Sequence, residues 1–209
     1  MLTERDKALV DILIRRVRVM SVDQVARTFW PTAGKPVEAA TKRLHDLAEE
    51  GWVTFFTVMA HPELQLEAPL TLWQPGTPPP DFGPIAQILR SRWSELERNT
   101  EVVSASARAG TELGGHGGRI PRPSETTHDL HLSSVYLAMR KDLPTRTQSW
   151  RCEADIAASG QRHGQKLPDA VVRDGRSFTA IEFGGAYQRP KLEEFHSFCA
   201  GKKMGYEIW

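Results

Sequence analysis

The most informative stretch of the sequence is LPDAVVRDGRSFTAIEFGG, residues 167–185. It holds two β-rich runs joined by turn residues that include an Asp-Gly pair, with the runs at 169–172 and 177–183 and the turn at 173–176. Valine, isoleucine, phenylalanine and threonine favour strands, and an Asp-Gly pair between two such runs favours a tight hairpin. We therefore predict a β-hairpin with one acidic residue, Asp169, at its start and another, Glu182, near its end.

The segments on either side of this hairpin complete a regular order. Residues 124–141 have the apolar spacing of a helix, and residues 148–157 have the composition of a strand that turns at 160–164. After the hairpin, Pro190 opens a predicted helix that runs to about Met204, and residues 205–209 close the chain as a strand. The predicted order is one helix, three strands, one helix and one strand.

The N-terminal part has three helical patterns followed by two strand-like runs. Thr3 and Ser21 are predicted N-caps, the second with Gln24 in a capping box, and Pro36 lies in the first turn of the third helix. These helices are expected to end near Arg16, Trp30 and Gly51, and the strand-like runs are 52–58 and 70–73. Three short helices followed by a two-stranded hairpin is the order of a winged helix-turn-helix.

In such a unit the third helix exposes one face that can enter a DNA major groove. The candidate DNA-binding residues are basic or can reach base edges, and they are Lys35, Thr41, Lys42, Arg43 and His45, with the nearby cluster Arg15, Arg16 and Arg18. Charges on an exposed helix also occur simply because they are solvated. Winged helices also mediate protein contacts, so binding to double-stranded DNA is one of two functions open to this unit.

Residues 75–83 contain four prolines and two glycines and are predicted to be a linker. The amphipathic stretch 84–99 that follows is predicted to be a helix that connects the two parts or forms a homodimer, with packing inside the chain as the alternative. A second, glycine-rich loop is predicted at 110–123. The predicted organisation is a winged helix at 1–75, a linker and connecting helix at 76–100, and a second domain at 101–209.

The composition is that of an ordinary globular chain. Its 209 residues include 27 Lys and Arg and 26 Asp and Glu, a net charge of +1, which excludes a non-specific polycation but not local DNA contacts. No window approaches the roughly 18 consecutive apolar residues of a membrane span. The two cysteines are too few for a disulfide framework or a four-cysteine zinc site. We expect a cytoplasmic protein, and composition leaves a DNA-binding protein, a small enzyme and an adaptor open.

The order αβββαβ, with Pro168-Asp169 on the second strand and Glu182 near the end of the third, resembles the PD-(D/E)XK nuclease fold. The resemblance implies that Asp169 and Glu182 hold a divalent cation such as Mg²⁺ and that a lysine positions the attacking water. Gly184 stands where that lysine is expected, so Lys191 in the following helix is the candidate amine. Glu153 is a possible third metal ligand, as are Glu125 and Asp129.

The whole chain resembles the replication-relaxation family of plasmids and other mobile elements, which combines a winged helix with a nuclease-like domain. The residues that carry this resemblance are Thr127–His131, Trp150–Glu153, Leu167–Val172 and Ile181–Gly185, with Lys191 downstream. The family has a Glu-x-Asp pair at the end of the third strand. In this chain Glu182 is the first residue of that pair, and Gly184 stands where the aspartate is expected.

The predicted fold class is α+β, and three functions remain open. The first is a DNA-binding regulator or accessory factor that acts in replication, mobilisation or transcription control of a mobile element and keeps a degenerate nuclease-like domain. In that case Asp169 serves the turn and Glu182 pairs locally, and no cofactor is needed. The second is a Mg²⁺-dependent endonuclease that uses Asp169, Glu182 and Lys191. The third is a protein-interaction adaptor.

Overall fold

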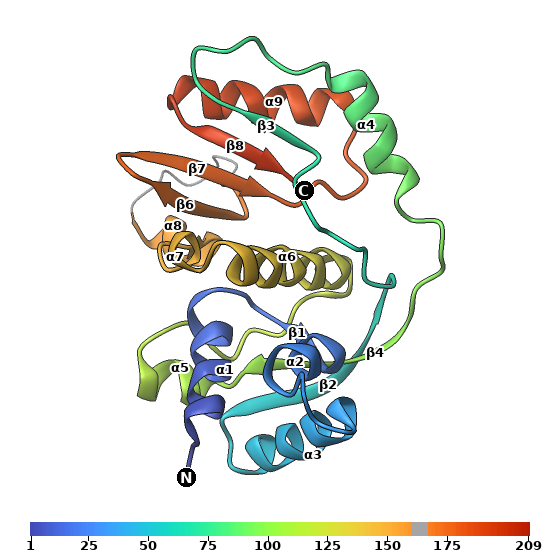
Figure 1. Ribbon diagram of the computed structural model, residues 1–209, viewed down its shortest axis with the longest axis vertical. Coiled ribbons are helices and arrows are strands. Elements are labelled where there is room, and N and C mark those ends of the chain that lie inside the picture. The colour runs from blue at the N-terminus through green and yellow to red at the C-terminus, as the bar shows by residue number, and fades with distance from the viewer. Residues whose placement is uncertain (160–166) are drawn as a thin grey trace. The chain divides into compact units, whose positions relative to one another are not determined.

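The computed structural model describes residues 1–159 and 167–209 and has an α+β fold, as predicted (Figure 1). The chain forms two compact units, and each combines two separate stretches. The first unit contains 1–63 and 97–137, and the second contains 64–96 and 138–209. This division differs from the predicted domains 1–75, 76–100 and 101–209. Strand pairing between distant segments makes the units discontinuous, and the local sequence pattern does not contain that information.

The first unit begins with three helices whose caps follow the sequence. Helix α1 (Glu4–Arg15) and helix α2 (Val22–Phe29) both start with complete capping boxes, in which Thr3 pairs with Asp6 and Ser21 with Gln24. Helix α3 (Pro36–Glu49) has proline in its first turn. It ends before Gly51, whose φ of 77° favours glycine. The three predicted helices are therefore confirmed.

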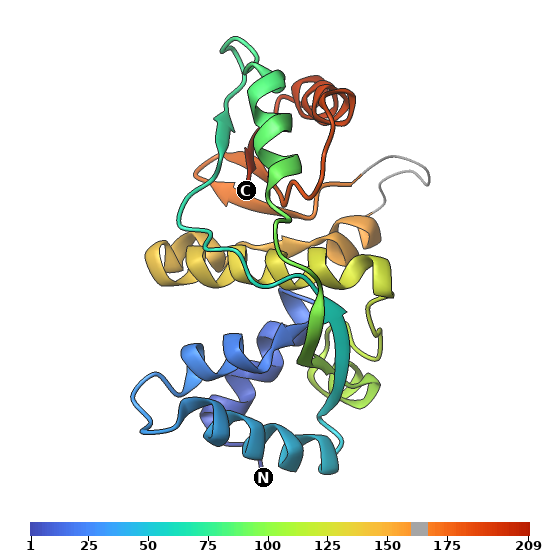
Figure 2. The ribbon, with the colours of Figure 1, turned by 90° about the vertical axis from the view of Figure 1, so that its right-hand side faces the viewer.

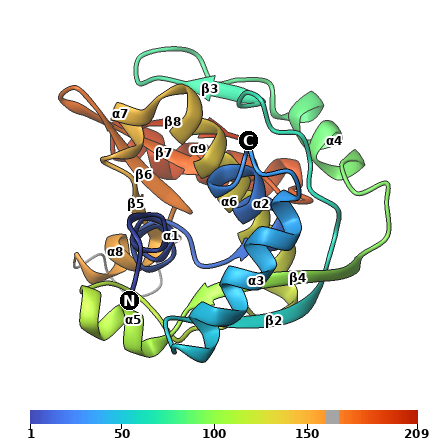
Figure 3. The same cartoon turned by 60° about the horizontal axis from the view of Figure 1, so that its bottom comes forward.

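The sheet of the first unit has the order β1-β4-β2 and is antiparallel throughout. Its strands are β1 (Met20–Ser21), β2 (Val53–Ala60) and β4 (Arg98–Ala105). Figure 3 shows β2 and β4 side by side, with α3 next to β2. The predicted hairpin between 52–58 and 70–73 is wrong, because β2 pairs with β4, from Val53 opposite Ala105 to Ala60 opposite Arg98.

Two helices follow β4 in the chain. The predicted loop at 110–123 is partly helical, since α5 (Ala107–Leu113) extends into it. Gly117 in the remaining loop is required sterically, because a Cβ there would overlap the carbonyl oxygen of Ser106. Helix α6 (Pro123–Asp142) confirms the helix predicted at 124–141. No helix in the described part of the chain combines the length and apolar character needed to cross a membrane.

The second unit contains a five-stranded sheet with the order β3-β8-β7-β6-β5. Strand β8 is parallel to β7, and the other pairs are antiparallel. The strands are β3 (Thr71–Trp73), β5 (Arg151–Cys152), β6 (Ala170–Asp174), β7 (Ser177–Glu182) and β8 (Gly205–Ile208). The helices are α4 (Phe82–Ser91), α7 (Pro144–Thr147), α8 (Glu153–Ala158) and α9 (Arg189–Gly201). The predicted β6–β7 hairpin, C-terminal helix and final strand are confirmed.

Helices α4 and α9 lie side by side and share one apolar core with the sheet (Figure 2). The helix predicted at 84–99 ends at Ser91, and its residues Ile85 and Leu89 are buried in this core. Packing inside the chain therefore accounts for most of its apolar face. Ile88 and Leu96 are the large apolar residues of this segment that stay exposed.

The strand predicted at 148–157 is mostly wrong. Only Arg151 and Cys152 pair with β6, and the chain then turns directly into α8. The backbone N–H of Glu153, the first residue of α8, donates to the carbonyl of Asp169 and ends the ladder there. The turn predicted at 160–164 lies outside the described residues.

Candidate functional site

The structure brings Asp169 and Glu182 together at one end of the β6–β7 hairpin. Asp169 directly precedes β6, Glu182 is the last residue of β7, and the register pairs Ala170 with Ile181 next to them. The backbone N–H of Asp169 lies 3.4 Å from Glu182 Oε2. The backbone N–H of Phe183 donates to Asp169 Oδ2 at 2.8 Å. Because the tight turn fixes the register, two acids thirteen residues apart become neighbours.

A tyrosine completes this site, and the sequence prediction did not include it. The Tyr187 hydroxyl donates to Glu182 Oε1 at 2.7 Å, and both side chains are buried, with Glu182 only 1% exposed. Burial raises the pKa of Tyr187 far above its ordinary value, and the negative charges of Glu182 and Asp169 add to the effect. Tyr187 therefore remains a neutral hydrogen-bond donor to the buried carboxyl group.

Lys191 contacts the same tyrosine. It lies in the first turn of α9 with an exposed side chain, and its Nζ is 3.5 Å from the centroid of the Tyr187 ring. This distance places the ammonium group in cation–π contact with the ring. Tyr187 thus links Lys191 to the acidic pair, through its ring on one side and its hydroxyl on the other.

The other proposed metal ligands do not join this acidic pair in a three-ligand group among the described residues. The Glu153 side chain is exposed on α8. Among the described residues, Glu153 forms no three-ligand group with Asp169 and Glu182 at metal-binding spacing. Asp129 and Glu125 belong to the first unit, where Arg18 contacts them at 2.7 and 3.8 Å.

The backbone that follows β7 is held by an arginine that the sequence prediction also missed. One Nη of Arg92 donates to the carbonyls of Trp209, at 2.7 Å, and Gly184, at 3.3 Å. Burial lowers the pKa of Arg92 to about 10. Gly184 has no room for a side chain, since a Cβ would lie 2.9 Å from both Ile208 Cγ2 and Leu89 Cδ1. The position of the expected lysine therefore faces the core of the second unit.

In the first unit, Arg43 is a structural residue rather than a free DNA contact. Its guanidinium contacts both carboxylate oxygens of Asp6, at 3.1 and 2.9 Å, and reaches Glu50 at 3.3 Å. The hydrogen bond with Asp6 raises the pKa of Arg43 above its ordinary value. Burial opposes ionisation of Asp6, but hydrogen bonds from Arg43 and Thr3 outweigh it and lower the pKa of that carboxyl group. Asp6 also completes the capping box of α1 with Thr3, so this pair connects α3 to the start of the chain.

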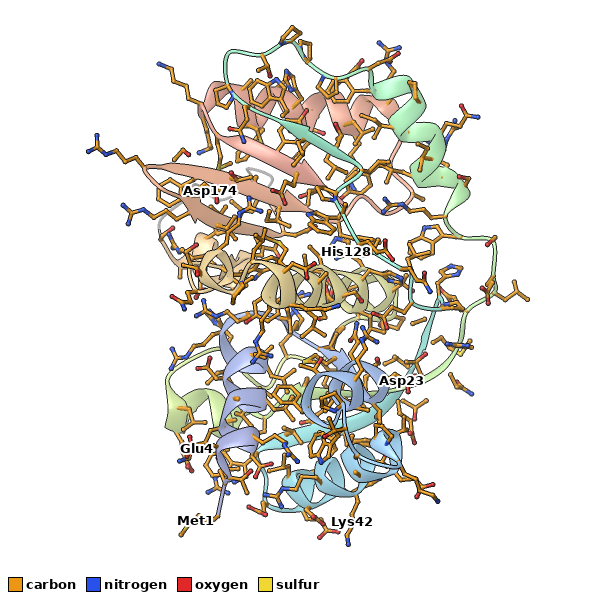
Figure 4. The ribbon with its side chains drawn as sticks, viewed as in Figure 1. Met1, Glu4, Asp23, Lys42, His128 and Asp174 are labelled. Atoms are coloured by element: carbon orange, nitrogen blue, oxygen red, sulfur yellow. The ribbon has the colours of Figure 1, made fainter. Side chains whose placement is uncertain are left out.

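The outer face of α3 does expose residues that can contact DNA. Lys42 is exposed, and its side chain points away from the helix (Figure 4). His45 is exposed and lies against the Phe55 ring of β2, with 4.4 Å between ring centroids. Thr41 is half-buried, and Lys35 is exposed with a surface ion pair to Glu38 at 2.7 Å. A surface pair of this kind is weak, so a phosphate can replace Glu38 as the partner of Lys35.

The cluster after α1 is largely engaged within the unit. Arg15 pairs with Asp11 at 2.7 Å and donates to the carbonyl of Leu113. Arg18 pairs with Asp129 at 2.7 Å. Arg16 is half-buried. Of the candidate DNA-binding residues, Lys42, His45 and Lys35 are therefore the best placed for an external partner.

Comparisons with family models, with curated proteins and with solved structures found no match to this chain.

Proposed function

We propose that the chain is a DNA-binding regulator or accessory factor of a mobile element, with a winged helix in the first unit and a degenerate PD-(D/E)XK nuclease-like domain in the second. The observation that carries the proposal is the β1-β4-β2 sheet of the first unit, flanked by three helices of which the third exposes Lys42 and His45.

The first unit supports a winged helix by its chain order. The order α1, β1, α2, α3, β2, β4, with the short first strand paired to the last, matches that of winged helices. Helix α3 then occupies the position of the helix that enters the major groove. The wing between β2 and β4 is replaced by a long excursion, because residues 64–96 belong to the second unit. This excursion explains why the sequence pattern misassigned the wing.

The chain order α6, α7, β5, α8, β6, β7, α9, β8 supports the nuclease-like assignment, since it contains the αβββαβ order with the short helices α7 and α8 inserted, although most of α6 belongs to the first unit. Strands β5, β6 and β7 form an antiparallel meander, and β8 joins it parallel to β7, as the αβββαβ resemblance implies. The neighbouring carboxyl groups of Asp169 and Glu182 are a second point of agreement. Together these features favour the replication-relaxation resemblance.

The acidic pair favours a degenerate domain over an active nuclease. Glu182 is buried and accepts the Tyr187 hydroxyl, and Asp169 accepts a backbone N–H, so protein donors already stabilise both acids. The expected lysine position at Gly184 is filled by core side chains. These contacts match the alternative in which Glu182 pairs locally.

DNA binding by α3 is tested with the variant Lys42→Ala/His45→Ala. Loss of one phosphate contact is expected to weaken binding to a short duplex about tenfold at about 0.1 M salt and to reduce the slope of log K against log salt by about 0.9. Fluorescence anisotropy over a salt series measures both quantities.

The matched control for this variant is Lys7→Ala. Lys7 is an exposed lysine on α1 paired with Glu4, and its removal changes the net charge by the same amount as removal of Lys42. If Lys42→Ala/His45→Ala binds DNA as tightly as Lys7→Ala does, α3 is not the DNA-binding helix. If the wild type does not bind duplex DNA, the adaptor hypothesis replaces the proposal.

A Mg²⁺-dependent endonuclease is the second candidate, favoured because Glu182 and Lys191 both contact Tyr187 and Asp169 lies next to Glu182. The donor chemistry fits a hard divalent cation, since each carboxylate oxygen has a second lone pair beyond the hydrogen bond it accepts. In that reaction Asp169 and Glu182 would hold Mg²⁺. The cation would supply charge stabilisation at the phosphodiester.

Supercoiled plasmid separates the two candidates. We expect the wild-type protein to leave the plasmid intact in Mg²⁺ and in Mn²⁺, because the buried acid is already paired. Nicking by the wild type that disappears in Glu182→Gln but persists in Glu101→Gln, an exposed acid of the first unit, would establish the endonuclease instead.

A homodimer through residues 84–99 also remains a proposal. Ile88 and Leu96 are the exposed apolar residues available for it.

A further inference from the structure

The β6–β7 hairpin extends past the neighbouring strand at one end of the second unit's sheet (Figure 1). Strand β8 begins at Gly205, which pairs with Thr179. The hairpin continues beyond that pair for two more rungs, Arg173 with Phe178 and Asp174 with Ser177. Its two-residue turn starts at Gly175, whose φ of 62° is the left-handed conformation that such turns require. The turn therefore reaches beyond the edge of the parallel pair.

Four basic residues gather at this end. Arg173 and Arg176 are exposed on the hairpin, and Lys202 and Lys203 are exposed just after α9. Because β7 and β8 are parallel and Gly205 pairs with Thr179, the residues that precede Gly205 lie beside the outer part of the hairpin. We call Arg173, Arg176, Lys202 and Lys203 the basic tip.

The two acidic residues near the basic tip share one arginine, so together with it they leave one negative charge against the four positive charges of the tip. Arg146 contacts both carboxylate oxygens of Asp174, at 2.8 and 2.9 Å, and its third nitrogen contacts Glu207 at 2.7 Å. Asp174, labelled on this hairpin in Figure 4, also accepts the Thr179 hydroxyl at 2.7 Å. In the part of the chain that the structure describes, no member of the basic tip forms a salt bridge. The positive charge of the tip is thus available to an external anion.

The composition of the tip is unusual for a turn that is merely solvated. Phe178 lies directly opposite Arg173 and is 49% exposed, so a large apolar ring accompanies the charges. A duplex offers both kinds of partner, since its phosphates attract the guanidinium groups and its deoxyriboses present apolar edges. A two-stranded ribbon also has a width that a DNA major groove admits. The whole chain carries a charge of only +1, so such a contact depends on this local cluster.

We propose that the basic tip binds the phosphate backbone of double-stranded DNA, which gives the second unit a DNA contact of its own. This inference rests on the proposed function, because it supplies a second contact to the duplex that α3 binds. Arginine favours phosphate as a partner, since its planar group donates two parallel hydrogen bonds. The retained nuclease-like domain then has a role that needs no catalysis.

The test is the full-length variant Arg173→Ala/Arg176→Ala in duplex-binding titrations over a salt series. Each lost phosphate contact is expected to weaken binding about tenfold at about 0.1 M salt and to lower the slope of log K against log salt by about 0.9. The matched control is Arg90→Ala/Arg189→Ala. It removes two exposed arginines of the same unit, from α4 and from the end of α9 opposite Lys202.

A second variant distinguishes a lost DNA contact from a misfolded hairpin. It is needed because Arg173 Nε also donates to the Gly175 carbonyl, within the turn itself. Arg173→Lys/Arg176→Lys keeps the charge and is expected to retain most of the affinity and the salt slope. If the alanine variant binds DNA like its control while Lys42→Ala/His45→Ala is weakened, the basic tip is not a DNA contact and the α3 proposal stands. The alanine variant would also bind DNA like its control if the basic tip binds an acidic protein instead of DNA. If the wild type binds no duplex, both proposals fail.

Discussion

Replacing Asp6 with alanine is expected to destabilise the first unit strongly, because its side chain is a buried, hydrogen-bonded carboxylate. The Asp6 side chain is 2% exposed, completes the capping box of α1 and contacts Arg43 with both oxygens. Loss of the cap costs about 1 kcal/mol and loss of the charged hydrogen bonds about 2 kcal/mol, so we expect a decrease of about 3 kcal/mol in the free energy of unfolding. Urea denaturation followed by circular dichroism measures it.

The control for Asp6→Ala is Asp11→Ala on the same helix. Asp11 is half-exposed and pairs with Arg15 one turn away, and such pairs contribute less than about 0.5 kcal/mol. Equal losses of stability in the two variants would contradict the role assigned to Asp6.

The same pair predicts a dependence of stability on pH. Because the pKa of Asp6 is lowered from its ordinary value of 3.8 in the folded protein, its stabilising effect is complete above that value. The effect declines as the pH falls through 3.8 toward the lower folded pKa. In Asp6→Asn this contribution is absent, so stability between about pH 5 and 2 should fall less steeply than in the wild type.

The second large effect is expected when a lysine is introduced at position 184, where the proposed nuclease resemblance expects one. Gly184→Lys would place a side chain where Leu89 and Ile208, both fully buried, already fill the space. Overpacking alone costs up to about 3 kcal/mol, and burying an ammonium group adds to it, so we expect a loss of more than about 3 kcal/mol and no gain of plasmid cleavage.

Gly185→Lys is the matched control, because no atom lies within 4 Å of a Cβ built on Gly185. Thermal and urea unfolding should leave Gly185→Lys close to the wild type and shift Gly184→Lys strongly. A stable Gly184→Lys protein would show that the core can open at this point. The lack of room at Gly184 would then no longer count against an active site.

A loss of stability in the first unit can imitate the loss of a DNA contact on α3. The sequence hypothesis included Arg43 among the DNA-binding residues, and an Arg43→Ala variant is expected to bind DNA poorly. That loss would reflect a weakened first unit, because Arg43 holds Asp6 and Glu50. Lys42 and His45 test DNA contact more directly, since both are exposed on the same helix.

Elements held by contacts between near neighbours in the chain were predictable. The capping boxes at Thr3 and Ser21 and the β6–β7 hairpin depend on residues a few positions apart, although the hairpin turn lies at 175–176, with its centre one residue later than that of the predicted turn at 173–176. Asp169 and Glu182 are neighbours because Asp174 pairs with Ser177; the predicted turn would have placed Asp169 opposite Ala180 instead. The sequence pattern contained the information for the caps and for the existence of the hairpin, but not for its register.

Features that depend on distant partners were missed. Leu70–Trp73 has the composition of a strand, and the structure contains β3 there. Composition does not specify the pairing partner of a strand, and β3 pairs with β8 instead of β2. Tyr187 carried no recognisable signal, since its contact with Glu182 depends on the turn after β7. Arg92, which reaches that turn from the end of α4, also carried no recognisable signal in the sequence.

The sequence by itself determined α1, α2, α3, α6 and α9, the caps at Thr3 and Ser21 and the existence of the hairpin, because each follows from short-range backbone geometry. Only the tertiary structure decided that β4 completes the first sheet, that Tyr187 bonds the buried acid and that Arg43 is structural. It also placed Lys202 and Lys203 beside the basic hairpin, through the parallel pairing of β7 and β8. These outcomes depend on which surfaces pack together, and packing is settled by the whole chain rather than by any segment of it.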